Sequence, residues 1–302
     1  MKYDEQNNKK LTQMKSAILI VFVFLGHILA AQNKTDVSLF LRSDSTTYLD
    51  EISSESGDLY NALGHHGPAI ENEWLGLRIY FDHKAAIDVY SKTKPGLELR
   101  KAQWYPTPEQ QKEGWGADYY KVGSTVGLGG IRLWDGEKVV ALDPVSQRWA
   151  RVVKEGTVSF MEMLSVDVPY KNRTVDILVR VTVYSGLRKA KVEAFALTDS
   201  PVQFVTGINY HEGQQVVVED NRIFTWGLHP EDVAVEKVEL GAVILFNPAD
   251  FEKRTDSGTQ HLLISKPGKY IECWISSANA NEQDLNTLKK FMDFPENKTA
   301  TR

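Results

Sequence analysis

The chain has 302 residues, 42% of them hydrophobic, and a formal net charge of −5. This charge offers no basic stripe for a phosphate backbone, so nucleic acid is not expected as a partner. The single cysteine, Cys273, excludes an intramolecular disulfide and a multi-thiolate metal site. The fold must therefore be stabilised by burial, which a chain of this length can provide.

The first 31 residues have the layout of a secretory signal peptide. Lys9, Lys10 and Lys15 precede an apolar run over residues 17–25, and residues 30–32 (Ala-Ala-Gln) offer small residues for cleavage. We expect the mature chain to begin near Gln32 and to be periplasmic or secreted; Met14 is an alternative start. The run is shorter than the ~20 residues of a membrane span, and no cysteine follows it to carry a lipid. No membrane anchor is expected.

From Val37 to Ser277 the dominant pattern has a period of two, which is typical of strands. Apolar residues alternate with other residues over 75–82, 175–184 and 192–197, and turn signals such as Asp135-Gly136 recur between such runs. This favours an all-β fold, a large antiparallel β-sandwich, over alternating βαβ units. Because no repeat, linker or boundary is visible, residues 32–302 are predicted to form a single domain.

One helix is predicted near the end of the chain, over Asn281–Met292. Asn279 and Glu282 resemble a capping pair, and the helix is expected to pack its apolar stripe on the sandwich. The residues with helical spacing before Pro295 are Leu285, Leu288, Phe291 and Met292.

Three stretches combine glycine, aromatic and ionisable residues in a way that a core does not require: residues 64–82, 102–136 and 207–215. In an extended segment His65 and His66 would point to opposite sides, so at most one of them is expected to face a given pocket. Arg78 stands between apolar strand neighbours. It either faces solvent or pairs with Glu71 or Glu73, or it points into a cleft and binds a carboxylate in a bidentate manner.

The other two stretches carry further candidates. Trp104 and Trp115, on a connection rich in Pro and Gly, either cover the core or form a stacking wall for a ligand. His211 stands where a strand is expected to leave its sheet, and residues 82–84 read as a plain turn. The histidines show no short metal-ligand spacing. The glycine-rich residues 127–130 are expected to precede a strand and not a helix, so they are not a phosphate-binding loop. No metal or cofactor is predicted.

Two segments are similar in sequence to a known protein family: GHHGPAIENEWLGLRIYFDHKAAIDVYSK and GWGADYYKVGSTVGLGGIRLWDG. They resemble a family of unknown function found in carbohydrate-degradation gene clusters of Bacteroidota, over about Ser53 to Phe291. Its members are similar to galactose-mutarotase-like β-sandwiches and include dehydratases of ulvan breakdown. The resemblance implies a hydro-lyase that removes water from a terminal uronic acid and leaves a 4,5-unsaturated sugar. The expected partner is an acidic oligosaccharide; the oligomeric state stays open.

Loss of water across C4 and C5 of a uronate needs a partner for the carboxylate, a base for the C5 proton and an acid for the C4 hydroxyl. Arg78 is the candidate for the first role. The proton-transfer candidates are His66, His211, Tyr119 and Tyr210. The substrate-binding candidates are His65, Glu73, Trp104, Trp115, Asp118 and Tyr210.

Two other functions suit the same residues. A polysaccharide lyase or a mutarotase-like epimerase also needs acid and base groups around an acidic sugar carbon. A non-catalytic carbohydrate-binding module needs only aromatic and polar loop residues.

Overall fold

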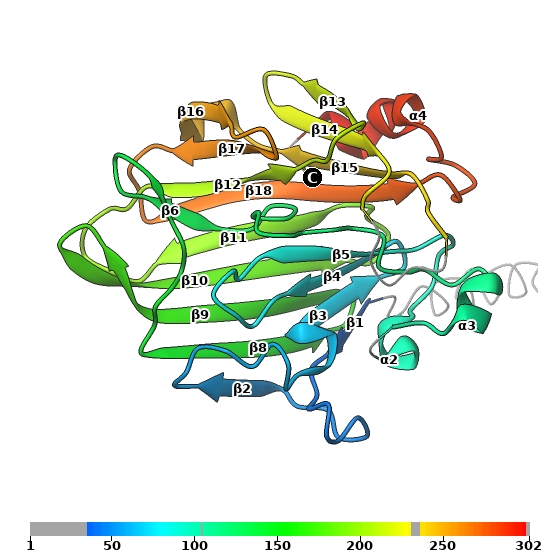
Figure 1. Ribbon diagram of the computed structural model, residues 1–302, viewed down its shortest axis with the longest axis horizontal. Helices are drawn as coiled ribbons and strands as arrows, with labels where there is room; N and C mark the ends of the chain where they lie inside the picture. The colour runs from blue at the N-terminus through cyan, green and yellow to red at the C-terminus, as the bar shows by residue number, and fades with distance from the viewer. Residues whose placement is uncertain (1–34, 104, 231–235, 300–302) are drawn as a thin grey trace, which may run out of the picture.

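The structure, a computed structural model, describes residues 35–103, 105–230 and 236–299. The expected signal peptide and Trp104 lie outside the described residues. The described chain forms three sheets in which all paired strands are antiparallel, with short helices at the periphery (Figure 1). This confirms the predicted all-β antiparallel sandwich.

The largest sheet has nine strands. In spatial order they are β13 (Gln215–Val218), β14 (Arg222–Gly227), β15 (Leu240–Leu245), β18 (Tyr270–Asn279), β11 (Ala190–Ala196), β10 (Arg173–Tyr184), β9 (Val158–Tyr170), β8 (Gln147–Glu155) and β2 (Glu51–Ser54). Burial alternates along β11 and along β10 from Val175 to Val181, as the period of two in the sequence predicts, and the register between β9 and β10 shifts between Val175 and Ile177.

Two smaller sheets complete the strand structure. The four-stranded sheet has the order β1 (Thr35–Ser38), β3 (Ala69–Asn72), β4 (Leu75–Ile79) and β5 (Ile87–Ser91). The five-stranded sheet has the order β16 (Phe251–Asp256), β17 (Gln260–Ser265), β12 (Phe204–Asn209), β6 (Arg132–Trp134) and β7 (Val139–Val140).

The glycine-rich segment after Val126 joins the two smaller sheets. Single bridges link Gly127 to Ile87 of β5, and Leu128 to Ile208 of β12. Gly127 has a φ of +70°, and a Cβ there would lie 2.0 Å from the Ile87 carbonyl oxygen, so the close approach requires glycine. The segment therefore has a structural explanation that needs no phosphate.

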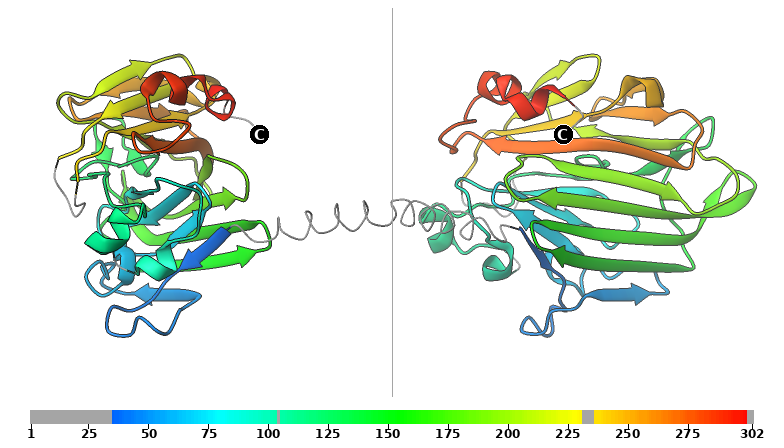
Figure 2. Two further views of the ribbon diagram at one scale, coloured as in Figure 1. Left: turned by 90° about the vertical axis from the view of Figure 1, so that its right-hand side faces the viewer. Right: turned by 180° about the vertical axis from the view of Figure 1, so that it is seen from behind.

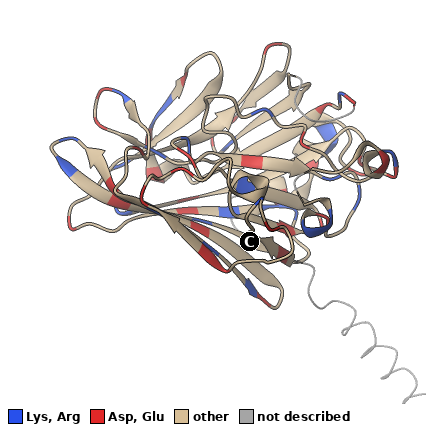
Figure 3. Cartoon of the chain, turned by 60° about the horizontal axis from the view of Figure 1, so that its bottom comes forward, with Lys and Arg blue, Asp and Glu red and all other residues tan. Residues whose placement is uncertain are grey.

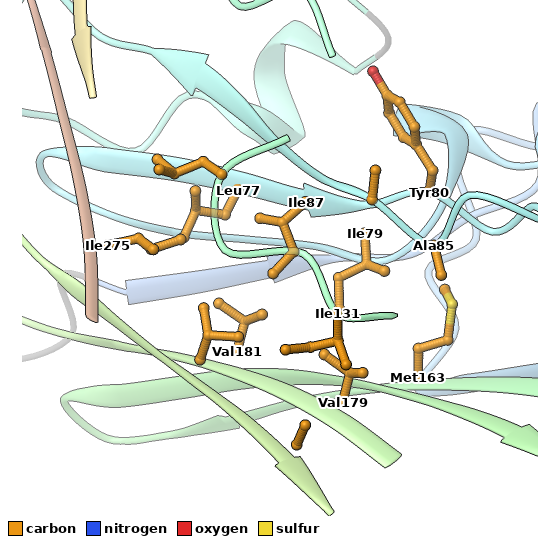
Figure 4. Close-up of a cluster of buried hydrophobic side chains, with 14 of the residues drawn as sticks. Leu77, Ile79, Tyr80, Ala85, Ile87, Ile131, Met163, Val179, Val181 and Ile275 are labelled. Atoms are coloured by element: carbon orange, nitrogen blue, oxygen red, sulfur yellow. The ribbon is translucent and has the colours of Figure 1, made fainter. Parts of the chain in front are cut away.

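The core lies between the four-stranded sheet and the large sheet. Figure 4 shows Leu77 and Ile79 of β4 and Ile87 of β5 directed toward Val179 and Val181 of β10. The same two layers are visible from the side and from behind in Figure 2. Every residue of β4 is buried, so its second face is covered as well. The polar residues that alternate with the core residues of β4 are therefore enclosed within the protein.

The helices within the described residues are short. They are η1 (Gly64–His66), α2 (Leu99–Ala102), α3 (Pro108–Lys112), η2 (Pro248–Asp250), α4 (Leu288–Asp293) and η3 (Pro295–Lys298). The predicted C-terminal helix is present, but its predicted start was wrong. It begins after Thr287, whose side chain accepts a hydrogen bond from the Lys290 N–H.

Asn279 and Glu282, the expected capping pair, do not cap this helix but make contacts with other parts of the chain. Glu282 does accept a hydrogen bond from the Asn279 N–H, but it also forms an ion pair with Arg188. The Asn279 amide donates to the Ser91 hydroxyl and the Lys92 carbonyl. These tertiary contacts hold the residues before Thr287 outside the helix, while Phe291 still packs on Phe224 and Trp226.

Candidate active site

The two adjacent histidines lie in η1, in a tight and strained turn. Both have positive φ angles, 55° for His65 and 61° for His66, which non-glycine residues rarely adopt and which are found preferentially at functional sites. The His65 ring is buried, with Nε2 3.1 Å from the Ser38 hydroxyl. The His66 ring is half-buried and makes different contacts. Of the two, only His66 borders the cluster described next.

His66 is held in one tautomer. Its Nδ1 lies 3.0 Å from the Tyr60 carbonyl oxygen, which can only accept, so Nδ1 carries the proton. The other nitrogen, Nε2, then accepts from the Tyr105 hydroxyl at 3.1 Å. Burial lowers the pKa of His66 to about 4, and the nearby positive charge of Arg78 acts in the same direction. At neutral pH the ring is uncharged and available as a base.

Arg78 lies next to this pair and is fully buried, with 0% exposure. Its Nη2 forms ion pairs with Asp88 and Asp118, the second at 2.7 Å. Burial opposes the charged guanidinium, but the two carboxylates outweigh it and raise the pKa of Arg78 above its ordinary value. Asp118, which the sequence analysis names as a substrate-binding candidate, forms a hydrogen bond and ion pair with Arg78.

Neither of the partners that the sequence suggests for Arg78 binds it. Glu71 forms an ion pair with Lys92 at 2.5 Å, and Glu73 accepts a hydrogen bond from the Gly186 N–H. Solvent does not reach Arg78 either, because the connection that carries Tyr105 and Asp118 covers the second face of β4. Both of these expectations were wrong, since they assumed that this face of the strand is open.

Tyrosines enclose the His66 ring. Tyr60 stacks on it with ring centroids 3.8 Å apart, and Tyr80 contacts it edge-on at 5.8 Å. The Tyr80 hydroxyl donates to Asp88, and in Figure 4 the ring points away from the core beneath it. Burial raises the pKa of Tyr105 above its ordinary range, so this phenol is protonated at neutral pH.

Sequence reasoning misses Tyr80, Tyr105 and Asp88. One signal for Asp88 exists: the turn at residues 82–84 pairs β4 with β5, and this register sets Asp88 opposite Arg78. Tyr80 follows two residues after Arg78, on the same side of the chain. Tyr105 stands on an irregular connection, whose course the sequence does not specify.

A second cluster contains His211. Its Nε2 lies 2.9 Å from the Lys121 carbonyl, while Nδ1 of His229 accepts from the Lys121 N–H at 3.0 Å. The rings of His211 and His229 meet edge-on at 4.8 Å, and Tyr120 lies against His229. Burial lowers the pKa of His229 to about 3. No direct contact joins His211 to His66 or Arg78 among the described residues. The Asp88 charge does contribute to raising the pKa of Tyr120.

Tyr210 and Tyr119 lie in different surroundings. The Tyr210 hydroxyl donates to Asp256 at 2.7 Å, at the edge of the five-stranded sheet. Tyr119 lines a pocket of about 350 Å³ together with Trp115. The remaining lining residues are Thr93, Gln111, Lys112, Gly114, Glu236 and Asn281. Of the two expected tryptophans, Trp115 thus borders an open pocket, as a stacking residue would.

Among the residues that the structure describes, no group of three or more His, Cys, Asp or Glu is arranged to hold a metal ion. Within those residues no helix has the length and apolar character needed to cross a membrane.

The family model described as "Domain of unknown function (DUF4861)" matches residues 27–300. The chain belongs to this family. A sequence comparison with curated proteins finds no match.

Solved structures share only a distant likeness with the DUF4861 chain. A protein assigned as an aldose 1-epimerase from Klebsiella pneumoniae is 11% identical, with a TM-score of 0.39, over 89% of this chain and 98% of its own. A heparan sulfate lyase from Pedobacter heparinus is 11% identical with a TM-score of 0.34, and a 4-alpha-glucanotransferase from Thermococcus litoralis is 12% identical with a TM-score of 0.34.

The matches to the lyase and to the transferase each cover 70% of this chain. The chain spans only 33% of the length of the lyase and 37% of that of the transferase. At these scores the likeness does not extend to activity.

Proposed function

We propose that the protein is a carbohydrate lyase that eliminates water from the terminal uronic acid of ulvan-type oligosaccharides and leaves a 4,5-unsaturated uronate. The observation that carries this proposal is the hydrogen bond between His66 and Tyr105. It couples a neutral imidazole to a protonated phenol, and both rings are half-buried rather than sealed in the core. The sequence resemblance of residues 64–92 and 114–136 to a family that includes ulvan dehydratases supports the same reaction.

The pair can supply both proton transfers. In this step the neutral Nε2 of His66 removes the C5 proton of the sugar, and Tyr105, whose hydroxyl lies 3.1 Å from that nitrogen, is the acid for the C4 hydroxyl. The electrons of the C5–H bond form the C4=C5 double bond as the C4–O bond breaks. The hydroxyl leaves as water with the proton from Tyr105, and His66 then returns its proton to the phenolate. Every proton is accounted for without a cofactor.

Arg78 then acts as a positioning residue. Its guanidinium carbon lies 5.7 Å from the centre of the Tyr105 ring, where its charge favours the phenolate. Because Nη2 already binds two carboxylates of the protein, a substrate carboxylate would meet excess negative charge here. The uronate carboxylate therefore needs a cation other than Arg78.

The test is an assay on a defined oligosaccharide with an intact terminal uronate. Rising near-ultraviolet absorbance with a mass loss of one water is the expected result. Rising absorbance with cleavage of the chain would instead identify a polysaccharide lyase. A change of configuration at constant mass would identify an epimerase, and binding without any of these changes would identify a carbohydrate-binding module.

A further inference from the structure

A second pocket lies beside the turn that follows β4. It has a volume of about 370 Å³. It is lined by His83, Lys84, Gly123, Ser124, Arg132 and Ala141. Positive side chains thus enter it from two segments of the chain, the turn after β4 and the strand β6. Elsewhere on the molecule, blue and red segments are interspersed along strands and loops in the view of Figure 3.

Arg132 is the unusual residue of this pocket. It is only 6% exposed, yet the one hydrogen bond of its side chain to the described residues runs from Nη1 to the Ile131 carbonyl at 2.7 Å. No carboxylate of the described residues lies within ion-pair distance of it. Burial lowers its pKa to about 10, so it stays charged at neutral pH. A buried guanidinium is normally paired, because desolvating an unpaired charge is costly.

The other charges at the pocket do not neutralise Arg132. The charge of Asp82 acts on Arg132, but the Asp82 Oδ1 accepts from the Lys84 and Ala85 N–H groups and its Oδ2 lies 3.6 Å from Lys84 Nζ. Arg148 adds further positive charge. The Lys84 side chain keeps 23% exposure, so its ammonium can reach a ligand.

Lys84 also connects this pocket to the His66 cluster. Its Nζ lies 5.3 Å from the centre of the Tyr60 ring and 5.1 Å from that of Tyr80. Tyr60 is the residue that stacks on His66. An anion held by Lys84 and Arg132 would therefore lie at the border of the proposed proton-transfer pair.

We propose that the pocket of Lys84 and Arg132 binds an oxyanion of the ligand, either the carboxylate of a uronate or a sulfate ester. A guanidinium and an ammonium that share one pocket repel each other, and a bound oxyanion removes the repulsion while accepting hydrogen bonds from both. The assignment of the anion to a sugar rests on the proposed function. The assignment of the pocket to an oxyanion does not.

The test measures dissociation constants by titration calorimetry with three probes: inorganic sulfate, a methyl glucuronide and a monosaccharide sulfate. Each is compared with chloride at equal ionic strength. We expect at least one probe to bind more tightly than chloride, and Lys84→Gln to weaken it about tenfold or more, as the loss of a charge-assisted hydrogen bond predicts. Whichever sugar binds more tightly identifies the source of the anion.

Arg132→Gln should have the same effect, and Lys84→Gln keeps the test valid if the buried variant fails to fold. Lys138→Gln is the matched control, because it removes one exposed positive charge outside the pocket and should leave binding unchanged. Equal binding of all probes and chloride, or unchanged binding in Lys84→Gln, would overturn the proposal.

The two proposals can fail separately. Elimination of water without specific anion binding would refute the pocket and leave the reaction standing. Specific binding that depends on Lys84, in a protein that removes no water, would refute the reaction and leave the pocket standing.

Discussion

Tyr60 holds His66 twice, through its ring, stacked at 3.8 Å, and through its carbonyl oxygen, 3.0 Å from Nδ1. The carbonyl fixes which nitrogen carries the proton, and the ring excludes water from one face of the imidazole. Burial is also the main reason why the pKa of His66 falls to about 4, even though the carbonyl contact acts in the opposite direction.

The pH dependence of activity follows from this shift. The base is the neutral imidazole, so we expect kcat/KM to be constant from neutral pH down to about 5 and to fall as the pH drops through about 4. An unshifted histidine would give the fall near pH 6.5. The pH profile of kcat/KM on the uronate oligosaccharide checks this. An acid limb centred near 6.5 would contradict the structure.

The proton-transfer pair can be tested by substitution. His66→Ala and Tyr105→Phe should each lower turnover by about 10²-fold or more, because each removes one half of the pair, with the thermal melting temperature nearly unchanged for Tyr105→Phe. Tyr210→Phe is the control, since it removes a phenol that is bound to Asp256. Near-normal turnover in Tyr105→Phe would exclude the proposed mechanism.

Arg78 should dominate stability. Arg78→Met leaves Asp88 and Asp118 buried without their cation, and we expect a loss of about 3–5 kcal/mol in the free energy of unfolding. Arg78→Lys should recover only part of it, because an ammonium lacks the planar fork. Urea denaturation measures both. Lys101→Gln, an exposed substitution, should change stability by less than about 0.5 kcal/mol.

The turn that carries His66 depends on Gly67. A Cβ at Gly67 would lie 2.0 Å from the backbone oxygen of Ile79, so Gly67→Ala must displace η1 from β4. We expect lower thermal stability and lower turnover. Gly96→Ala offers a matched control, because a Cβ there meets no atom within 4 Å. Equal effects of the two substitutions would show that the close packing at Gly67 is not needed.

Trp115 provides a test of sugar binding in the 350 Å³ pocket. If its ring stacks on a sugar away from the reacting carbon, Trp115→Ala should raise KM several-fold and leave kcat nearly unchanged. Trp149→Ala removes a half-buried tryptophan from β8 of the large sheet and should leave both constants unchanged. Steady-state kinetics separates the outcomes, and an unchanged KM in Trp115→Ala would remove this pocket from the proposed substrate path.

The sequence predicts the strands well because their period is local. Val179 and Val181 alternate with Leu178, Arg180 and Thr182, and the structure buries both valines as the period of two requires. The helix start was less predictable, because Glu282 is bound by Arg188, which stands 94 positions earlier in the chain. Local capping rules do not include such tertiary competition.

The candidate site also contains some residues that a local sequence pattern indicates and others that only the tertiary fold brings together. His66 stands out through its glycine-flanked pair, which is a local signal. Tyr105 and Asp118 reach Arg78 only because the connection between α2 and β6 folds back over β4, and no spacing in the sequence encodes that path. Nor does the sequence show that Arg132 lacks a carboxylate partner among the described residues while Arg78 and Arg188 each have one.

The contacts of Lys121 have a consequence for variation among related chains. Its N–H binds His229 and its carbonyl binds His211, so both imidazoles are oriented by main-chain atoms that every residue type except proline supplies in full. The side chain at position 121 takes no part in either of these two hydrogen bonds. A comparison of side chains among related chains would therefore overlook these main-chain contacts. Only proline at position 121 would remove the N–H that binds His229.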